Sequence, residues 1–193
     1  DEVDRAAERV RMIHHRLGLD SQEELLWVHT SMVDSFIDIA KRSGMPISER
    51  EIDEYLKQMV IFAELVGIER TSVPASFVEL TNYMEAIKPR LEGSVEAKRT
   101  AVFLTFPPMS PLLRFATPAT ALWASVATLA GASLPRWARD LYGWPTFPGQ
   151  EGITNRSLIA FRQRALQLPE IARMSPYARA QRDHARDKAG VTQ

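Results

Sequence analysis

The chain has 193 residues, of which 45% are hydrophobic and 25% are charged, and it contains no cysteine. This length is enough to bury one substantial core, and the lack of cysteine excludes disulfides, zinc–thiolate sites, iron–sulfur clusters and a cysteine nucleophile. The net charge is zero but unevenly divided: residues 1–100 hold 13 Lys and Arg against 19 Asp and Glu (net −6), and residues 101–193 hold 11 against 5 (net +6). This polarity argues against general nucleic-acid binding and gives the second half a basic character.

Cellular location is suggested by what the sequence lacks. No secretory signal is visible and cysteine is absent, so we predict a cytoplasmic protein. The chain enters a helical pattern directly at Asp1, and we expect a further helical segment upstream. The uncharged stretch 115–135 is the candidate for a membrane span, but its Pro, Thr, Ser and Ala make it only modestly hydrophobic. We therefore predict a buried or partly buried helix there, and membrane contact that is at most peripheral.

Apolar residues recur at helical spacing throughout the first half of the chain, and strand patterns are nearly absent. Caps, glycines and prolines mark the helix ends. Four helices are predicted in this half: residues 1–17, residues 21–43 with Asp20 or Ser21 as the cap, a third from the capping box Ser48-x-x-Glu51 to Val66, and a fourth from Ser76-x-x-Glu79 to Pro89.

The second half has more breaks. A helix near 95–105 is predicted to end at the proline-rich turn FPPMSP, and Pro118 suits the first turn of the small-residue helix that follows. Three more helices are predicted near 135–142, ending at Gly143, near 152–167 and near 176–188. The predicted fold class is therefore all-α, with about eight helices in a single domain over residues 1–193.

Two of the four histidines face inward by helical periodicity. His14 is in register with the apolar residues of its helix, whereas His15 lies about 100° around the axis and is predicted to face solvent. His29 lies in the middle of the apolar face of the second helix. The stripe that contains His14 is Val3, Ala7, Val10 and Leu17.

The inward histidines leave two interpretations open. Each can be a core histidine that hydrogen-bonds to a backbone carbonyl or a carboxylate. Alternatively, an imidazole in an apolar helical pocket is kept neutral by burial, and the neutral form is the one that binds haem iron.

Several longer runs of the sequence point to a family. In order, the chain contains ERVRMIHHRLG, ELLWVHTSMVDSF, PISEREIDEYLKQMVIFAELVGI, VPASFVELTNYMEAI and LPRWARDLYGWP. Together these runs resemble the MpaB-type oxygenase family, which is related to the latex-clearing rubber oxygenases. The resemblance implies a globin-like helical core and a b-type haem bound through one proximal histidine. It also implies that dioxygen is used to cleave an isoprenoid double bond.

The resemblance assigns roles to individual residues. It implies that His14 is the cofactor-binding residue and the metal ligand, through Nε2, with an acceptor for Nδ1–H. His29 is typical of the MpaB-type branch, where it would support the haem pocket, line its distal side or serve as an alternative ligand. Met32 and Phe36 would contribute to an apolar distal side. The catalytic residue is not assigned, and the family's Arg and Thr near the haem would lie before Asp1.

Two functions of different classes follow. The first is a haem b-dependent oxygenase that uses dioxygen to cleave or oxidise an apolar, isoprenoid-like small molecule, with no nucleic acid as partner. The alternative is a non-catalytic, all-helical domain that binds an apolar ligand or a protein partner. The sequence does not set the oligomeric state.

Overall fold

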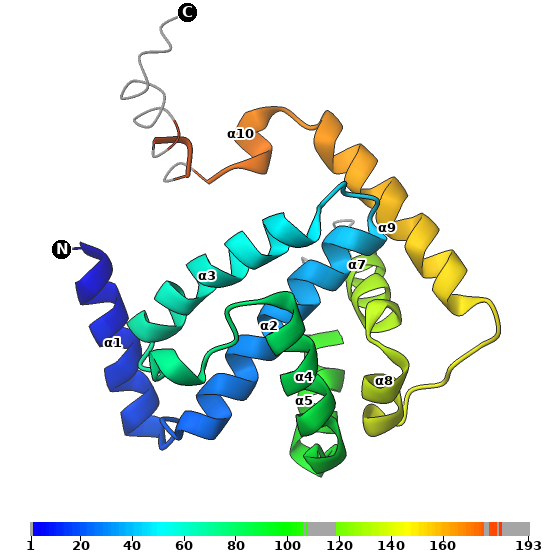
Figure 1. Cartoon of the computed structure of the whole chain (residues 1–193). Coiled ribbons are helices and arrows are strands. Elements are labelled where there is room, and N and C mark those ends of the chain that lie inside the picture. The colour runs from blue at the N-terminus through cyan, green and yellow to red at the C-terminus, as the bar shows by residue number, and fades with distance from the viewer. Residues whose placement is uncertain (1, 106, 108–118, 176–177, 181, 183–193) are drawn as a thin grey trace, which may run out of the picture.

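A computed structural model describes residues 2–105, 107, 119–175, 178–180 and 182 (Figure 1). Over these residues the fold is all-α, as predicted, with nine α-helices, two short 3-10 helices and no strand. The α-helices are α1 (Glu2–Leu17), α2 (Gln22–Arg42), α3 (Glu49–Leu65), α4 (Phe77–Ile87), α5 (Val95–Thr105), α7 (Ala119–Ser133), α8 (Arg136–Tyr142), α9 (Gln150–Gln167) and α10 (Glu170–Arg173). The 3-10 helices are η1 (Arg70–Ser72) and η2 (Lys88–Arg90).

The helix starts follow the capping residues in the sequence. Ser21 is the N-cap of α2, where its side chain accepts a hydrogen bond from a backbone N–H of the first turn. Ser48 and Glu51 form the complete reciprocal capping box at the start of α3. Ser76 caps α4 by accepting from the Glu79 backbone N–H. These caps satisfy N–H groups that have no partner inside a helix, so they fix where each helix begins.

The second half agrees with the prediction where it is described. The α8 helix ends at Gly143, whose φ of +70° lies in the left-handed region that favours glycine. The short α10 was not predicted. The FPPMSP turn, Pro118 and most of the helix expected near 176–188 lie outside the described residues. The extent of a single domain to residue 193 therefore stays a prediction.

The main core lies between α2, α3 and α4. Each of these helices contributes an apolar stripe that is almost fully removed from water. The buried residues of this cluster are Val33, Ile37, Ile52, Leu56, Leu80 and Met84. A second, smaller cluster joins the end of α3 to the segment that follows it. Its members are Val60, Ala63, Ile68 and Val73. In Figure 1, α2 and α3 cross the middle of the molecule, with α1 on one side and α9 on the other.

Arg42 ties the core to the second half of the chain. Its Nε donates to Oδ1 of Asn155 on α9 over 2.8 Å, and its Nη1 donates to the Ser133 carbonyl at the end of α7 over 2.6 Å. The same Nη1 bonds to Asp38 one turn earlier on α2, over 2.9 Å. One half-buried guanidinium therefore joins three helices, and it places a cation at the negative end of α7.

Arg139 also caps the end of α7. Only 2% of this residue is exposed, and its Nη1 donates to the carbonyls of Ala132 and Leu134 over 3.0 and 2.9 Å. Together with Arg42, it provides donors for three successive carbonyls at the end of α7. The last carbonyls of a helix have no hydrogen-bond donor inside the helix. The two arginines supply these donors where burial keeps water away.

The α1 helix has the predicted bounds, but the prediction of a buried stripe is wrong for most of it. Ala7 is 8% exposed and His14 is half-buried, but Val3, Val10 and Leu17 are 46%, 36% and 63% exposed. The reason is that α1 packs mainly against α3, so one line of contact covers only part of its apolar face.

The α7 helix is partly buried, as expected for the small-residue segment. It packs against α9, and its Gly131 lies so close to Trp144 that a Cβ there would come within 2.5 Å of the indole ring. Its outer face remains open: Leu122 is 64% exposed. Among the described residues, no helix has both the length and the apolar character needed to span a bilayer.

The core is the first test of this fold. Leu56 is 1% exposed at the centre of the main cluster, and Leu56→Ala leaves a cavity that the neighbouring helices fill only in part. We expect the free energy of unfolding to fall by about 3 kcal/mol in denaturant melts. Ile61→Ala, on the same helix but 56% exposed, should change it by less than about 0.5 kcal/mol. Equal losses in both variants would contradict the assigned core.

Candidate functional site

The position of His14 depends on how α1 is anchored. Three residues before it, Arg11 donates through Nη1 to the Leu65 carbonyl at the end of α3, over 2.6 Å. The Arg11 side chain also lies against Gly67, where a Cβ would be 3.4 Å from its Cδ atom. A cation at the last carbonyls of a helix is favourable both as a hydrogen bond and through the helix dipole. Arg11 therefore holds the second half of α1 against the end of α3, and His14 with it.

The two ring nitrogens of His14 have different environments. Nδ1 is enclosed by protein and has no hydrogen-bond partner. Nε2 is not sealed off in this way, and it too has no hydrogen bond among the described residues. The acceptor expected for Nδ1–H is thus not found. The imidazole is half-buried, and its Nε2 is left without a partner in the described part of the chain.

His29 is the more deeply buried histidine. It is 5% exposed on α2, and its ring stacks on Phe62 of α3 with 6.1 Å between ring centroids and 21° between planes. Its Nδ1 is buried without a hydrogen-bond partner. Burial lowers the pKa of His29 below its ordinary value of 6.5, because the charged imidazolium loses its hydration. The side chain is therefore held in the neutral form, which is the form that binds metals and donates or accepts single hydrogen bonds.

An apolar face of α2 lies beside His29 and is covered only in part: Leu25 and Met32 pack against the core clusters, whereas Val28 and Phe36 remain open. Residues three or four apart share a helix face, and this face comprises Leu25, Val28, Met32 and Phe36. Val28 and Phe36 are 62% and 57% exposed, and the other two are half-buried. Phe62, which stacks on His29, is itself 43% exposed. Met32 and Phe36 thus lie on one face, as the resemblance implied, but Phe36 is open to solvent.

The structure does not join the two inward histidines directly. Neither a hydrogen bond nor a ring contact links His14 to His29 among the described residues. His15 points away from both, as predicted: its side chain is 84% exposed, and Nδ1 lies 2.7 Å from Oδ2 of Asp20. This hydrogen bond lowers the pKa of Asp20. His184 lies outside the described residues.

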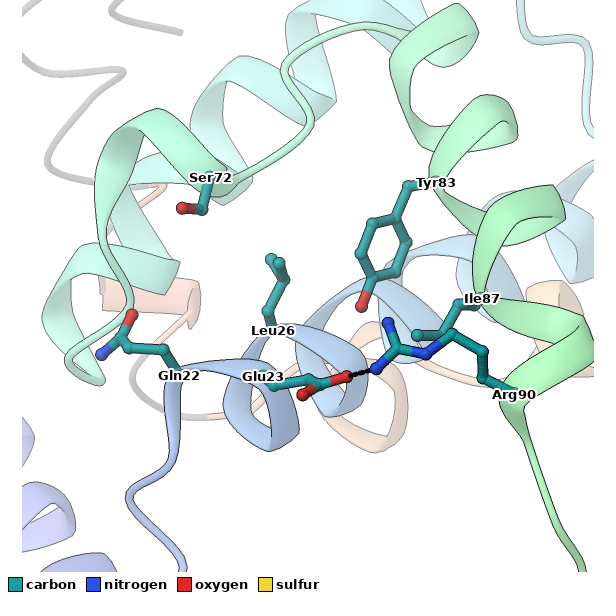
Figure 2. Close-up of a pocket in the computed structure, with 7 residues that line it drawn as sticks. All are labelled: Gln22, Glu23, Leu26, Ser72, Tyr83, Ile87 and Arg90. Carbon is teal, nitrogen blue, oxygen red and sulfur yellow. Dashed lines mark hydrogen bonds and ion pairs between the residues drawn. The ribbon is translucent and has the colours of Figure 1, made fainter.

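A pocket of about 360 Å³ opens between the start of α2, η1 and the end of α4 (Figure 2). Figure 2 shows Leu26 and Tyr83 projecting into the same space, with Glu23 and Arg90 joined by an ion pair at its edge. Neither His14 nor His29 lines it. Local periodicity in the sequence carries no signal for this pocket, because its ion pair joins residues 67 apart in the chain.

A second hollow, of about 520 Å³, lies between α7 and α9. It is lined mainly by small, apolar and hydroxyl-bearing side chains: Ala124, Ser125, Thr128, Leu129, Ala132, Ile153, Thr154 and Ser157. No charged side chain lines it. Because the side chains of α7 are small, they leave space between the two helices. Since this space has no charged lining, the groove is suited to an uncharged, largely apolar molecule.

A metal ion held by protein side chains alone finds no site in the described part of the chain. No three His, Asp or Glu side chains gather there at a spacing that would hold an ion. A porphyrin differs in this respect, since it supplies four of the iron's ligands itself and needs only one histidine from the protein. The residues present fit such a group: Nε2 of His14 has no hydrogen-bond partner among the described residues, and exposed apolar side chains lie on α1, α2 and α3.

The lowered pKa of His29 gives a measurable pH dependence. An imidazole whose pKa is lower in the folded state adds stability above pH 6.5, and this contribution is lost as the pH falls through the folded-state pKa. Wild type should therefore lose free energy of unfolding below pH 6.5 relative to His29→Gln, measured by denaturant melts across pH. The His29→Gln variant is needed as a reference because burial also raises the pKa of Asp34. A raised carboxyl pKa increases the free energy of unfolding as the pH falls, which opposes the effect of His29. Parallel pH curves for the two proteins would rule out a buried, neutral His29.

Comparison with known proteins identifies the family. The model of the family described as "ER-bound oxygenase mpaB/B'/Rubber oxygenase, catalytic domain" matches residues 1–164, which include α1 to α8 and most of α9. No curated protein and no solved structure matches this chain, so the globin-like arrangement stays a prediction. The family match covers well over half of the 193 residues. The chain therefore belongs to the family of mpaB/B' and rubber oxygenase catalytic domains.

Proposed function

We propose that this chain is a haem b-dependent oxygenase domain in which His14 binds the haem iron. Its substrate would be an apolar, isoprenoid-like small molecule that is oxidised or cleaved with dioxygen. The observation that carries the proposal is the state of the His14 ring: Nδ1 is enclosed by protein without a hydrogen-bond partner, and Nε2 makes no hydrogen bond among the described residues. The oxygenase family of the chain supports the same chemistry.

The surroundings of His14 support an apolar macrocycle as the partner. Large apolar side chains on three neighbouring helices are more than a third exposed: Val10 and Leu17 on α1, Val28 and Phe36 on α2, and Ile61 and Phe62 on α3. Covering apolar surface is favourable by roughly 25 cal/mol per Å², so an apolar group that covers side chains of this kind gains affinity. The same contacts would remove water from around the reacting groups.

The haem, when bound, supplies the activation of dioxygen, and the chain supplies binding and orientation. His14 Nε2 provides the single protein ligand, and Arg11 fixes the helix that carries it. The apolar face of α2 would hold an alkene and exclude water. Burial keeps His29 neutral beside this face, so it is available to support the pocket, to line the distal side or to serve as an alternative ligand.

The lack of cysteine supports a cytoplasmic location.

A second function is favoured by a different observation. The hollow of about 520 Å³ between α7 and α9 is lined by no charged side chain and touches neither histidine. A non-catalytic domain that binds an apolar ligand would use this groove and would need no haem. Haem binding distinguishes the two functions, because the groove offers no imidazole to an iron.

The proposed function is tested by haem reconstitution of the full chain. The protein is titrated with haemin, and its absorption spectrum is compared with those of His14→Ala and two control variants. We expect a Soret band and at least tenfold tighter haem binding in wild type than in His14→Ala, because the single protein ligand is lost. His15→Ala should bind haem as wild type does, since that side chain is exposed and paired with Asp20.

The controls make the outcome decisive. Circular dichroism shows whether each variant keeps its helices, so that a loss of haem is not a loss of fold. A Soret band that survives in His14→Ala but is lost in His29→Ala would assign the iron to the other histidine. A folded chain that binds no haem at all would reject the oxygenase proposal and favour the ligand-binding domain.

A further inference from the structure

We propose that the pocket between the start of α2, η1 and the end of α4 binds a small, uncharged molecule that combines an apolar body with a carbonyl oxygen. A ketone, an aldehyde or an ester of medium chain length has this chemistry. The volume of this α2–α4 pocket, about 360 Å³, lies within the range of small-ligand sites, roughly 300–1,000 Å³. Because neither His14 nor His29 lines it, the proposal goes beyond the haem site and does not depend on it.

The base of the α2–α4 pocket is built from apolar side chains of two helices. Leu26 projects from α2, and Tyr83 and Ile87, which are four residues apart, lie on one face of α4 (Figure 2). Ile87 is 9% exposed, and the other two are half-buried. Tyr83 packs against the main core cluster and Leu26 against the second cluster. The pocket therefore lies between the two clusters, where an apolar body can cover side chains that belong to the core.

One wall of the α2–α4 pocket is held in place without a ligand. Gln22 donates through Nε2 to the Gly67 carbonyl over 2.7 Å, and its Oε1 accepts from the Glu69 backbone N–H over 2.9 Å. These two bonds fix η1 against the start of α2, and Ser72 at the end of η1 lies across the pocket from Tyr83 (Figure 2). A site that is already ordered spares a ligand the cost of ordering loops when it binds.

Two hydrogen-bond donors border the pocket on the α4 side. The Tyr83 hydroxyl has no hydrogen-bond partner in the described part of the chain, and in Figure 2 it is directed toward the edge where Arg90 lies. Arg90 bonds to Glu23 through Nη2, and its Nε and Nη1 make no hydrogen bond among the described residues. A carbonyl oxygen has two lone pairs and no proton to donate, so it is complementary to donors of this kind.

The charges at the edge of the pocket favour an uncharged ligand. Glu23 and Arg90 form an ion pair there, with each side chain 64% exposed, and no other charged side chain lines the pocket. An anionic group would be attracted by Arg90 but repelled by Glu23, and a cationic group would meet the reverse. A carbonyl group can accept from Tyr83 while the ion pair stays intact. The apolar base and the balanced edge therefore select for a neutral molecule with one oxygen acceptor.

The test is a titration of the full chain, followed in two-dimensional amide NMR spectra. The probes are methyl hexyl ketone, octanoate and octylammonium, which have chains of the same length but differ in charge. We expect the ketone to cause saturable shifts of the Leu26, Ser72 and Ile87 amide signals. The two ions should bind about tenfold more weakly, because each of them meets a like charge at the edge or must break the ion pair.

Matched variants test the hydrogen bond and the space separately. Tyr83→Phe should weaken ketone binding about fivefold through the loss of one hydrogen bond, whereas Tyr55→Phe, which is half-buried outside the pocket, should change it less than about twofold. Ser72→Phe fills the pocket and should weaken binding by about tenfold or more. Thr71→Phe places the same ring at the adjacent exposed position and should leave binding within about twofold of wild type. The amide spectra also show whether each variant is folded.

Three results would overturn the proposal. The first is a ketone titration with no saturable shift in the pocket, or with shifts at Thr128 and Ser157, which would place the ligand in the groove between α7 and α9. The second is binding of either ion as tight as that of the ketone, since the edge would then select for charge. The third is an equal loss of ketone binding in Tyr83→Phe and Tyr55→Phe.

Discussion

The burial of one face of α2 against α3 and α4 is the constraint on which the other features depend. Val33 and Ile37 are 1% and 4% exposed there, and burying such side chains contributes about 1.5–3 kcal/mol each. The same packing brings His29 against Phe62 and strips it of water. The neighbouring side of α2, with Val28 and Phe36, remains open. The core and the open apolar side chains of α2 are therefore two sides of one helix.

Arginines set the positions of the helices around that core. Arg42 and Arg139 donate hydrogen bonds to the last carbonyls of α7, and Arg11 donates to the last carbonyl of α3. In each case a cation meets the negative end of a helix, where backbone carbonyls have no partner of their own. The second half of the chain and α1 differ in how they are attached to the core. The second half is linked to α2 through a three-helix bridge, whereas α1, which carries His14, is attached along a single line of contact with α3.

Local patterns were sufficient for the helices and insufficient for their surroundings. Ser48 and Glu51 act within four residues of each other, and a sequence pattern captures them completely. Periodicity also placed His15 in solvent and His29 on a buried face. The stripe of α1 was correct as a pattern, yet burial depends on what covers it, and Leu17 is open. The Glu23–Arg90 pair and the bonds of Arg139 depend on tertiary packing or backbone carbonyls, and neither leaves a repeat in the sequence.

The central claim is that one imidazole, His14, links this helical shell to a haem. The most direct measurement is chemical rescue of the haem spectrum, with His14→Gly and His29→Gly reconstituted in parallel and titrated with free imidazole. The account predicts that His14→Gly alone has an altered spectrum and that added imidazole restores the wild-type spectrum, because the small ligand fills the space of the lost ring. Restoration in His29→Gly instead, or an unchanged spectrum in His14→Gly before imidazole is added, would contradict it.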